Sequence, residues 1–246
     1  MNPLPLLTAV LWAAPAPDLV ERGTVRLHYL QLPVGYERYE VSRDGEDRVL
    51  KSEFDFTDRG GRVQLAATLR MGPDWAPRWF QARGKSYRFV NVDSEVSLEG
   101  SSAAVRSRSE TSRVETSGPV FTIDGYAPFA VQMMLLRYWN ANGRPRVLAT
   151  LRGKPLNEVR IELRGREKFQ AAGRTISLDR FTLEGVVWGR ETVWLDERGA
   201  FAAAITRAGA RRWYGRGGQP NEHCQSAASP PERTGRHSAC PFRFLT

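Results

Sequence analysis

Apolar and polar residues alternate along most of the chain with a period of two, a pattern typical of β-strands with one buried face. In the stretch at 147–151, Val147, Ala149 and Leu151 are expected to share the apolar face. The stretches that show the alternation most clearly are residues 24–32, 50–56, 62–70, 147–151 and 158–164. The pattern therefore predicts a mainly β fold.

Short turns separate these strands, and strands joined by such turns pair as antiparallel neighbours. Glycine, which tolerates positive φ, marks the predicted turns at 58–61, 171–173 and 196–199. The apolar residues Ile176 and Leu178 occupy one parity, whereas Phe181 and Leu183 occupy the other. This shift predicts a β-bulge near residues 179–180 that would curve the sheet.

One segment, residues 128–143, has the pattern of a helix instead. Pro128 suits its first turn, Asn142 and Gly143 suit its C-terminal end, and Pro145 prevents its continuation. The first two turns are apolar on nearly every side, so this helix is expected to be buried. The predicted fold is a large curved antiparallel sheet, a half-barrel, with one buried helix on its concave face.

The first residues of the chain predict export. Residues 1–16 contain an apolar run too short to span a bilayer, and Ala14 and Ala16 supply small residues at the spacing of a cleavage site. No Lys or Arg precedes that run, and a frayed or buried N-terminal strand is the alternative interpretation. A signal peptide over residues 1–16 implies a periplasmic or secreted protein.

The last part of the chain has a different composition. Gly, Ser, Pro and Arg dominate from Arg207 onward, and the alternation stops. Such a composition buries too little apolar surface to offset the chain entropy. We expect an antiparallel β domain over residues 22–207 and a disordered basic tail over residues 208–246.

The net charge argues against a nucleic-acid partner. The chain of 246 residues has a net charge of +9, and residues 207–246 contain seven Arg and two Glu. The remaining 206 residues therefore have an excess of only four positive charges. A groove for nucleic acid needs cationic side chains gathered on one folded face, and the predicted β domain mixes both signs.

No catalytic or metal-binding constellation stands out in the sequence. The three histidines are His28, His223 and His237, and no H-x-H, H-E-x-x-H, paired C-x-x-C or G-x-S-x-G motif is present. His223 and His237 lie near Cys224 and Cys240 in the tail, where chance proximity is favoured over a zinc site and a disulfide is an open alternative. No metal and no cofactor are expected.

Acidic residues near predicted hairpins, such as Glu191 and Asp196, are expected to be solvated. Aromatic residues are the more suggestive feature, because aromatics that line a concave sheet could hold an apolar small molecule or a lipid. Packing between sheet and helix is the alternative interpretation. The candidate ligand-binding residues are Tyr126, Met133, Tyr138, Trp139, Trp188 and Trp194.

Four segments form an ordered series along the chain: GYERYE (35–40), FDFTDRG (54–60), TIDGYAP (122–128) with QMMLLRYW (132–139), and WGRETVWLD (188–196). This series resembles the β domain that precedes the catalytic barrel in some secreted bacterial amidohydrolases of the imidazolonepropionase-like type. The resemblance covers roughly residues 22–208. The layout is also similar, at the level of the fold, to periplasmic half-barrels of the lipoprotein-carrier kind.

The resemblance implies that the catalytic chemistry lies elsewhere. In such enzymes the metal ligands lie in the following barrel, which begins with an H-x-H strand, and this chain contains none. A shifted reading frame or a premature end near residues 208–212 would produce the observed tail. The leading hypothesis is a non-catalytic exported β module, for scaffolding or ligand binding, from the front of a truncated amidohydrolase whose catalytic domain would be its partner. The alternatives are a periplasmic carrier of a lipid or other apolar ligand and a hydrolase of unrecognised type.

Overall fold

The structure is a computed structural model, and it describes residues 18–29, 32–58, 60–85, 91–124, 126–151, 156–171, 173–187 and 189–206. The predicted signal peptide (1–16), the predicted tail (208–246), Trp188, His223, His237, Cys224 and Cys240 lie outside the described residues. Those interpretations therefore stay predictions.

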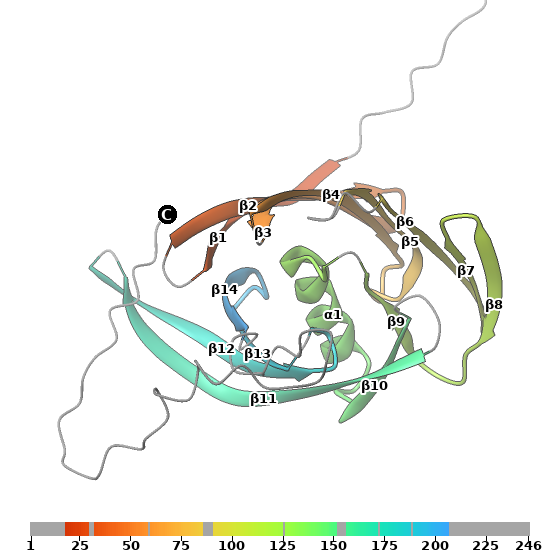
Figure 1. Cartoon of the computed structure of the whole chain (residues 1–246). Coiled ribbons are helices and arrows are strands. Elements are labelled where there is room, and N and C mark those ends of the chain that lie inside the picture. Colours follow the sequence, from red (N-terminus) through yellow and green to blue (C-terminus); the bar gives the residue numbers. More distant parts are fainter. Residues whose placement is uncertain are drawn as a thin grey trace, which may run out of the picture.

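The first eight strands form one antiparallel sheet, sheet A, in which each strand pairs with its neighbours in sequence. This simple order follows from the short connections between consecutive strands. Figure 1 shows sheet A as an arch over the helix. Its strands are β1 (Asp18–Tyr29), β2 (Leu32–Asp44), β3 (Asp47–Asp58), β4 (Gly61–Met71), β5 (Pro77–Lys85), β6 (Asn91–Glu99), β7 (Ser102–Ser107) and β8 (Glu110–Glu115).

The remaining strands form a second sheet, sheet B, in the order β14-β13-β12-β11-β10-β9. Its pairs are antiparallel except for β9 and β10, which are parallel because the helix α1 (Phe129–Ala141) connects them as a crossover. The strands are β9 (Val120–Thr122), β10 (Val147–Leu151), β11 (Leu156–Ala171), β12 (Arg174–Glu184), β13 (Arg190–Leu195) and β14 (Phe201–Thr206).

Helix α1 lies between the two sheets (Figure 1). Pro128 precedes its first residue, Asn142 donates its backbone N–H to the carbonyl of Tyr138 at the C-terminal end, and Gly143 has a φ of +78°. Nine of its thirteen residues are buried. The helix is too short to cross a membrane, and no helix in the described part of the chain is long and apolar enough to do so.

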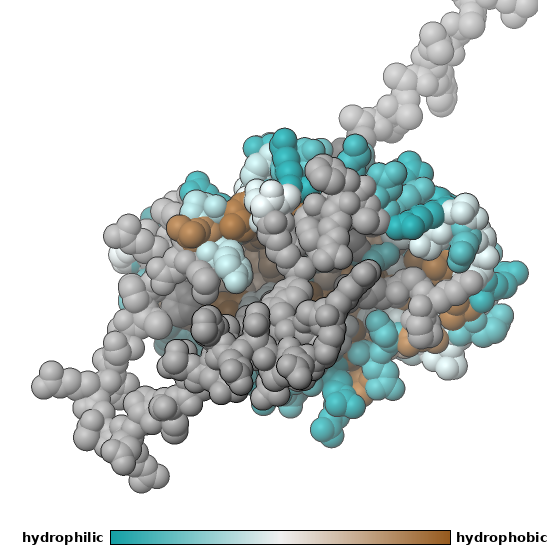
Figure 2. All heavy atoms as spheres, viewed as in Figure 1, coloured by the Kyte–Doolittle hydropathy of each residue, from teal (hydrophilic) through white to brown (hydrophobic). Residues whose placement is uncertain are grey.

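The main hydrophobic core combines the helix with both sheets. Leu50 and Phe80 of sheet A and Leu183 and Val193 of sheet B are fully buried in the same cluster as α1. Burying a side chain of this size contributes roughly 1.5–3 kcal/mol. Figure 2 shows mostly hydrophilic residues along the upper edge of the molecule, and hydrophobic residues in the hollow below it and at a few places on the right and lower edges. The prediction of a mainly β, curved fold with one buried helix is confirmed, with the strands divided between two sheets.

Strand β4 shows why the alternation is informative. Its residues Val63, Leu65, Ala67, Leu69 and Met71 are all buried, and none of the residues between them is. Sheet A thus places one face on the core and the other toward water, as the period of two indicates.

Two local predictions differ from the structure. In β10, Leu148 is buried opposite Val159 whereas Val147 is exposed, because apolar residues occupy both faces of this short strand and parity alone does not choose between them. The stretch at 24–32 is not one strand, because β1 ends at Tyr29, which pairs with Leu32 at the start of β2.

The curvature of sheet B has a visible cause. A register shift lies between Leu163 and Gly165 of β11, opposite Phe181 and Arg180 of β12. The bulge was predicted near residues 179–180 of β12. The structure places it opposite these residues, on β11, where Arg164 is the extra residue. A residue inserted in this way bends the strand and increases its twist.

Candidate functional site at the start of helix α1

Three of the predicted ligand-binding residues belong to α1 and are packed into the core. Met133, Tyr138 and Trp139 are 0%, 3% and 4% exposed. The ring of Tyr138 lies 5.5 Å from that of Phe121, and Trp139 meets Phe181 edge-on at 6.1 Å. Their surfaces are covered by the protein's own side chains.

The other predicted residues lie in different places. Tyr126 is half-buried and packs edge-on against Phe56 at a ring distance of 5.6 Å. Trp194 of β13 is half-buried, donates its indole N–H to Glu167 at 2.9 Å and packs edge-on against Phe169. The predicted set is therefore not gathered around one cavity, and Trp188 lies outside the described residues.

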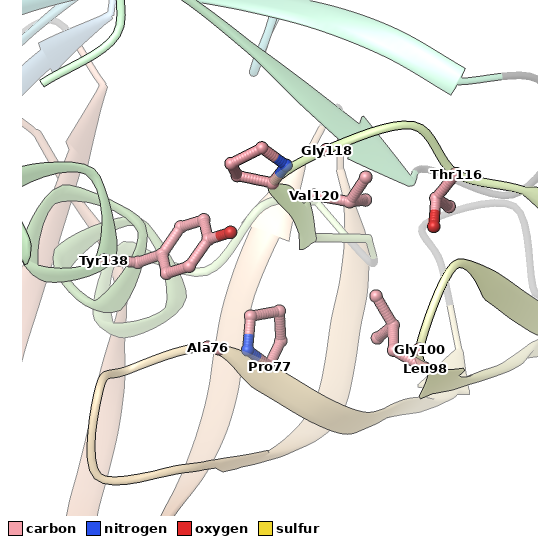
Figure 3. A pocket seen from close by; sticks show the side chains of 9 residues that line it. Ala76, Pro77, Leu98, Gly100, Thr116, Gly118, Val120 and Tyr138 are labelled. Atoms are coloured by element: carbon pink, nitrogen blue, oxygen red, sulfur yellow. The ribbon is translucent and has the colours of Figure 1, made fainter. Parts of the chain in front are cut away.

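A pocket of about 190 Å³ lies beside Tyr138 (Figure 3). Figure 3 shows the Tyr138 side chain reaching from α1 toward the segment that holds Gly118 and Val120. Burial raises the pKa of Tyr138 to about 12, so its hydroxyl stays protonated. Sites for drug-sized ligands measure roughly 300–1,000 Å³, so this pocket suits a smaller guest. Its lining residues are Ala76, Pro77, Leu98, Gly100, Thr116, Gly118, Pro119, Val120 and Tyr138.

The four segments of the motif series meet near the first turn of α1. Glu37 comes from the first segment and contacts the helix backbone. Phe54 and Phe56 come from the second and pack on Phe129 and Tyr126, respectively. The fourth segment supplies Glu191. Residues of these segments are therefore neighbours in space, although they are far apart in sequence.

Glu37 of β2 is fully buried and holds the start of α1. Its carboxylate accepts the backbone N–H groups of Phe129 at 2.7 Å and Ala130 at 2.9 Å, and the hydroxyl of Ser52 at 2.7 Å. Burial raises the pKa of Glu37, and the three hydrogen bonds act against that rise. Pro128 provides no side-chain cap, so a carboxylate from sheet A satisfies donors that a helix start otherwise leaves unpaired.

Gly35 brings β2 close to β3 two residues before Glu37. Gly35 pairs with Phe56 in the sheet register. A Cβ atom at this position would overlap the carbonyl oxygen of Asp55 and the Cα of Phe56. Because both are backbone atoms, the clash has no easy relief, and glycine is required here.

Glu191 of β13 is the second buried carboxyl beside α1, with 1% exposure. Its Oε1 accepts the hydroxyl of Thr206 at 2.8 Å, and the side chain of Gln132 lies beside it, but its Oε2 has no hydrogen-bond partner. Burial raises the pKa of Glu191 to about 7, against the opposing hydrogen bonds of Thr206 and Gln132. The prediction that Glu191 is solvated is wrong, because its strand position faces the core.

A signal for both carboxyls is present in the sequence. Glu37 shares the parity of Tyr39 and Val41, and Glu191 shares the parity of Val193 and Leu195. An acidic residue on the apolar parity of a strand points into the core, where it needs a partner. Whether an acidic residue is buried is therefore better predicted from its position in the alternation than from its proximity to a hairpin.

Arg137 holds the helix near its other end. Its guanidinium donates to Glu21 of β1 at 2.8 Å and to the carbonyl of Gly199 at 2.9 Å. Tyr39 donates to the same glutamate at 3.1 Å, and the ring of Trp75 lies 5.2 Å from the guanidinium carbon. These contacts join the β1 edge of sheet A to the turn between β13 and β14.

The polar groups around α1 are thus engaged mainly with the helix and the strands beside it. Within the described ranges, no group of three or more His, Cys, Asp or Glu side chains is arranged to hold a metal ion. The fold and these contacts define a mainly β protein in which one helix lies between two sheets.

Comparison with known proteins finds similarity among solved structures. No family model matches the sequence, and no match is found among curated proteins. Among solved structures, the chain is similar to a β-barrel-like protein of a domain of unknown function, DUF1849, from Brucella abortus. The identity is 12%, the TM-score is 0.45, and the match covers 68% of this chain and 78% of that chain. Neither the family models nor the curated proteins link this chain to amidohydrolases, so that link stays a prediction.

Proposed function

We propose that this chain is a non-catalytic, exported β module that serves as a scaffold at the front of an amidohydrolase of the imidazolonepropionase-like type. The observation that carries the proposal is the use made of Glu37. Its carboxylate is fully buried and accepts three hydrogen bonds from α1 and β3. A carboxyl occupied in this way holds the helix and is withdrawn from any substrate.

The packing of α1 supports a scaffold over a carrier. Met133, Tyr138 and Trp139 are at most 4% exposed, and they contact core side chains from both sheets. A carrier needs an open apolar surface of ligand size, whereas these side chains have little surface left to offer.

The amidohydrolase link rests on the four motif segments, which converge at the start of α1. Glu37, Phe54, Tyr126 and Glu191 come from different segments, and all lie near the start of α1. These residues fix α1 between the two sheets. Any protein that has this β domain would need them, with or without a catalytic barrel after it.

The link to an amidohydrolase is tested by sequencing the gene from codon 200 onward and translating all three frames. We expect one frame to encode an H-x-H strand followed by alternating strands and helices. Three frames without this pattern would overturn the amidohydrolase link and leave a stand-alone module.

The scaffold proposal is tested on the purified full chain. We expect no hydrolysis of amide or ester substrates in the presence of Zn²⁺, Co²⁺ or Mn²⁺, and no lipid in organic extracts analysed by mass spectrometry. Hydrolysis that persists after removal of residues 207–246 would contradict the proposal and establish an enzyme of another type.

Export is tested separately by N-terminal sequencing of the protein recovered from the periplasm or the medium. Cleavage after Ala16 is the expected result. An intact Met1 in a protein retained in the cytoplasm would show that residues 1–16 are not a signal peptide.

A carrier of an apolar ligand is the second candidate, and the cavity beside Tyr138 is the observation that favours it. Leu98 lines this cavity, whereas Leu163 is an exposed residue of β11 elsewhere on the surface. If the protein is a carrier, Leu98→Trp should abolish binding of a fluorescent fatty acid and Leu163→Trp should not. Absence of binding by the wild type removes this candidate.

A further inference from the structure

Two hydrogen-bond acceptors are left without partners at the contact between sheet B and α1. They are Oε2 of Glu191 and Oε1 of Gln132, both in side chains that are 1% exposed. The amide group of Gln132 is oriented by its own donor, because its Nε2 donates to the carbonyl of Ala127 at 2.8 Å. Exchanging the amide atoms would place an oxygen against that carbonyl, so the assignment is fixed by the network.

A single proton would complete this arrangement. A carboxylate has only acceptors, but a protonated carboxyl has one O–H donor. A proton on Oε2 of Glu191 would supply the donor that Oε1 of Gln132 lacks, while Oε1 of Glu191 continues to accept from Thr206. Both buried polar atoms would then be satisfied, which removes a large desolvation penalty.

We propose that Glu191 is protonated in the folded protein below neutral pH and that its carboxyl group, bonded to Gln132 and Thr206, forms a proton-controlled clasp joining β13, α1 and β14. Loss of the proton at higher pH removes the donor to Oε1 of Gln132 and leaves a buried carboxylate with one unsatisfied oxygen. This inference goes beyond the scaffold function and does not depend on it.

The charge distribution around Glu191 favours the neutral carboxyl. Strand β14 has no charged residue, and the charged residue of α1, Arg137, is engaged with Glu21 and Gly199. On the adjacent strand ends, Glu184 and Arg190 pair with each other.

From sheet A, Glu37 binds the helix backbone near Gln132. Tyr138, the other titratable residue of α1, lines the pocket on the sheet A side. Burial raises the pKa of Glu191 from 4.5 to about 7, and no charged group contributes to the shift. No described cation is therefore placed to hold Glu191 as an anion.

The direction of the pH effect follows from the raised pKa. The folded state binds the proton more tightly than the unfolded state, so the stabilisation is fully present below pH 4.5 and is lost as the pH rises through about 7. For these two pKa values, Glu191 alone should increase the unfolding equilibrium constant roughly 30-fold between pH 5.5 and pH 8.5.

The experiment is urea unfolding of the full chain at several pH values between 5.5 and 8.5, with Glu191→Gln as the test variant and Glu158→Gln as the matched control. The glutamine amide can donate to Gln132 and accept from Thr206, so this variant mimics the protonated state at every pH. Glu158 is exposed on β11. We expect the pH dependence of the unfolding equilibrium constant to be about 30-fold larger in the wild type and in Glu158→Gln than in Glu191→Gln.

A second readout is the side-chain carboxyl ¹³C shift of Glu191 in the intact protein, compared between wild type and Thr206→Val. The hydroxyl of Thr206 lowers the pKa of Glu191, so its removal should move the midpoint upward. A midpoint near 4.5 in the wild type, as expected if a water molecule bridges the two acceptors, would overturn the clasp. An unchanged slope in Glu191→Gln would overturn it as well.

Discussion

The two buried glutamates beside α1 differ in how many donors they meet. Glu37 of sheet A accepts three hydrogen bonds, two of them from the helix backbone. Glu191 of sheet B accepts the hydroxyl of Thr206 and lies beside Gln132, and one of its oxygens is unpaired. Burial raises the pKa of both carboxyls, but the local supply of donors differs.

This difference shows that burial alone does not assign a role to an acidic residue. At Glu37, backbone donors and the positive end of the helix dipole favour a carboxylate in a structural role. At Glu191, the lack of donors favours a neutral carboxyl whose charge state depends on pH. The same residue type therefore acts as a fixed anchor on one sheet and as a titratable group on the other.

The largest effect is expected from Glu37→Met. The substitution leaves the N–H groups of Phe129 and Ala130 and the hydroxyl of Ser52 without an acceptor, which should cost about 3–5 kcal/mol of unfolding free energy. Urea unfolding measures the loss. Glu40→Met, an exposed position on the same strand, is the control and should change stability by about 0.5 kcal/mol or less. Equal losses of unfolding free energy in Glu37→Met and Glu40→Met would show that Glu37 does not anchor the helix.

Glu191→Met should behave differently from Glu37→Met. At pH 8 an apolar side chain replaces a poorly paired buried carboxylate, so stability should stay within about 1 kcal/mol of the wild type or increase. At pH 5.5 the wild type regains its neutral carboxyl, and the variant should be the less stable protein. A loss of roughly 3 kcal/mol of unfolding free energy at pH 8 would show that Glu191, like Glu37, is a structural carboxylate.

Removing one hydrogen-bond donor from each glutamate should have a smaller effect on stability and should still distinguish Glu37 from Glu191. Ser52→Ala removes one of three donors to Glu37, and Thr206→Val removes the hydroxyl bonded to Glu191; each should cost about 1 kcal/mol. The two variants differ in pH dependence. Only Thr206→Val should move the stability transition near pH 7 upward, as measured by unfolding across the pH range.

The smallest effect is expected on the outer face of sheet A. Arg62 donates to Asp55 at 2.7 Å in an exposed pair, and this contact lowers the pKa of Asp55. Arg62→Ala should leave the unfolding midpoint unchanged, because exposed ion pairs are largely screened by solvent. It should also return the pKa of Asp55 toward its ordinary value in a carboxyl NMR titration. A clear loss of stability would show that this face is more than a solvated surface.

Local patterns are sufficient to predict the elements of this fold. The alternation in β4 specifies its buried face, and the apolar run between Pro128 and Gly143 specifies a buried helix. The division into two sheets was not predictable in the same way, because it depends on how the crossover through α1 places β10 beside β9. That pairing is a long-range contact with no local signature.

The polar contacts of α1 were missed for a related reason. Glu37 and its partner Phe129 are 92 residues apart, and neither residue forms a recognisable motif with its sequence neighbours. Trp194, a candidate ligand-binding residue, lies on the strand parity opposite to buried Val193 and Leu195 and donates to Glu167. Whether its exposed part meets a ligand stays a prediction.

The separation between Glu37 and α1 also has a consequence for the order of assembly during synthesis. The strands of sheet A pair with their sequence neighbours, so its hairpins can form as they leave the ribosome or a translocation channel. The apolar face of that sheet, however, stays uncovered until α1 arrives. At roughly 5–20 residues per second, the 92 residues between Glu37 and Phe129 represent a delay of roughly 5–20 seconds. During this interval the nascent sheet is a substrate for chaperones and a target for aggregation, and the arrival of one helix ends that exposure.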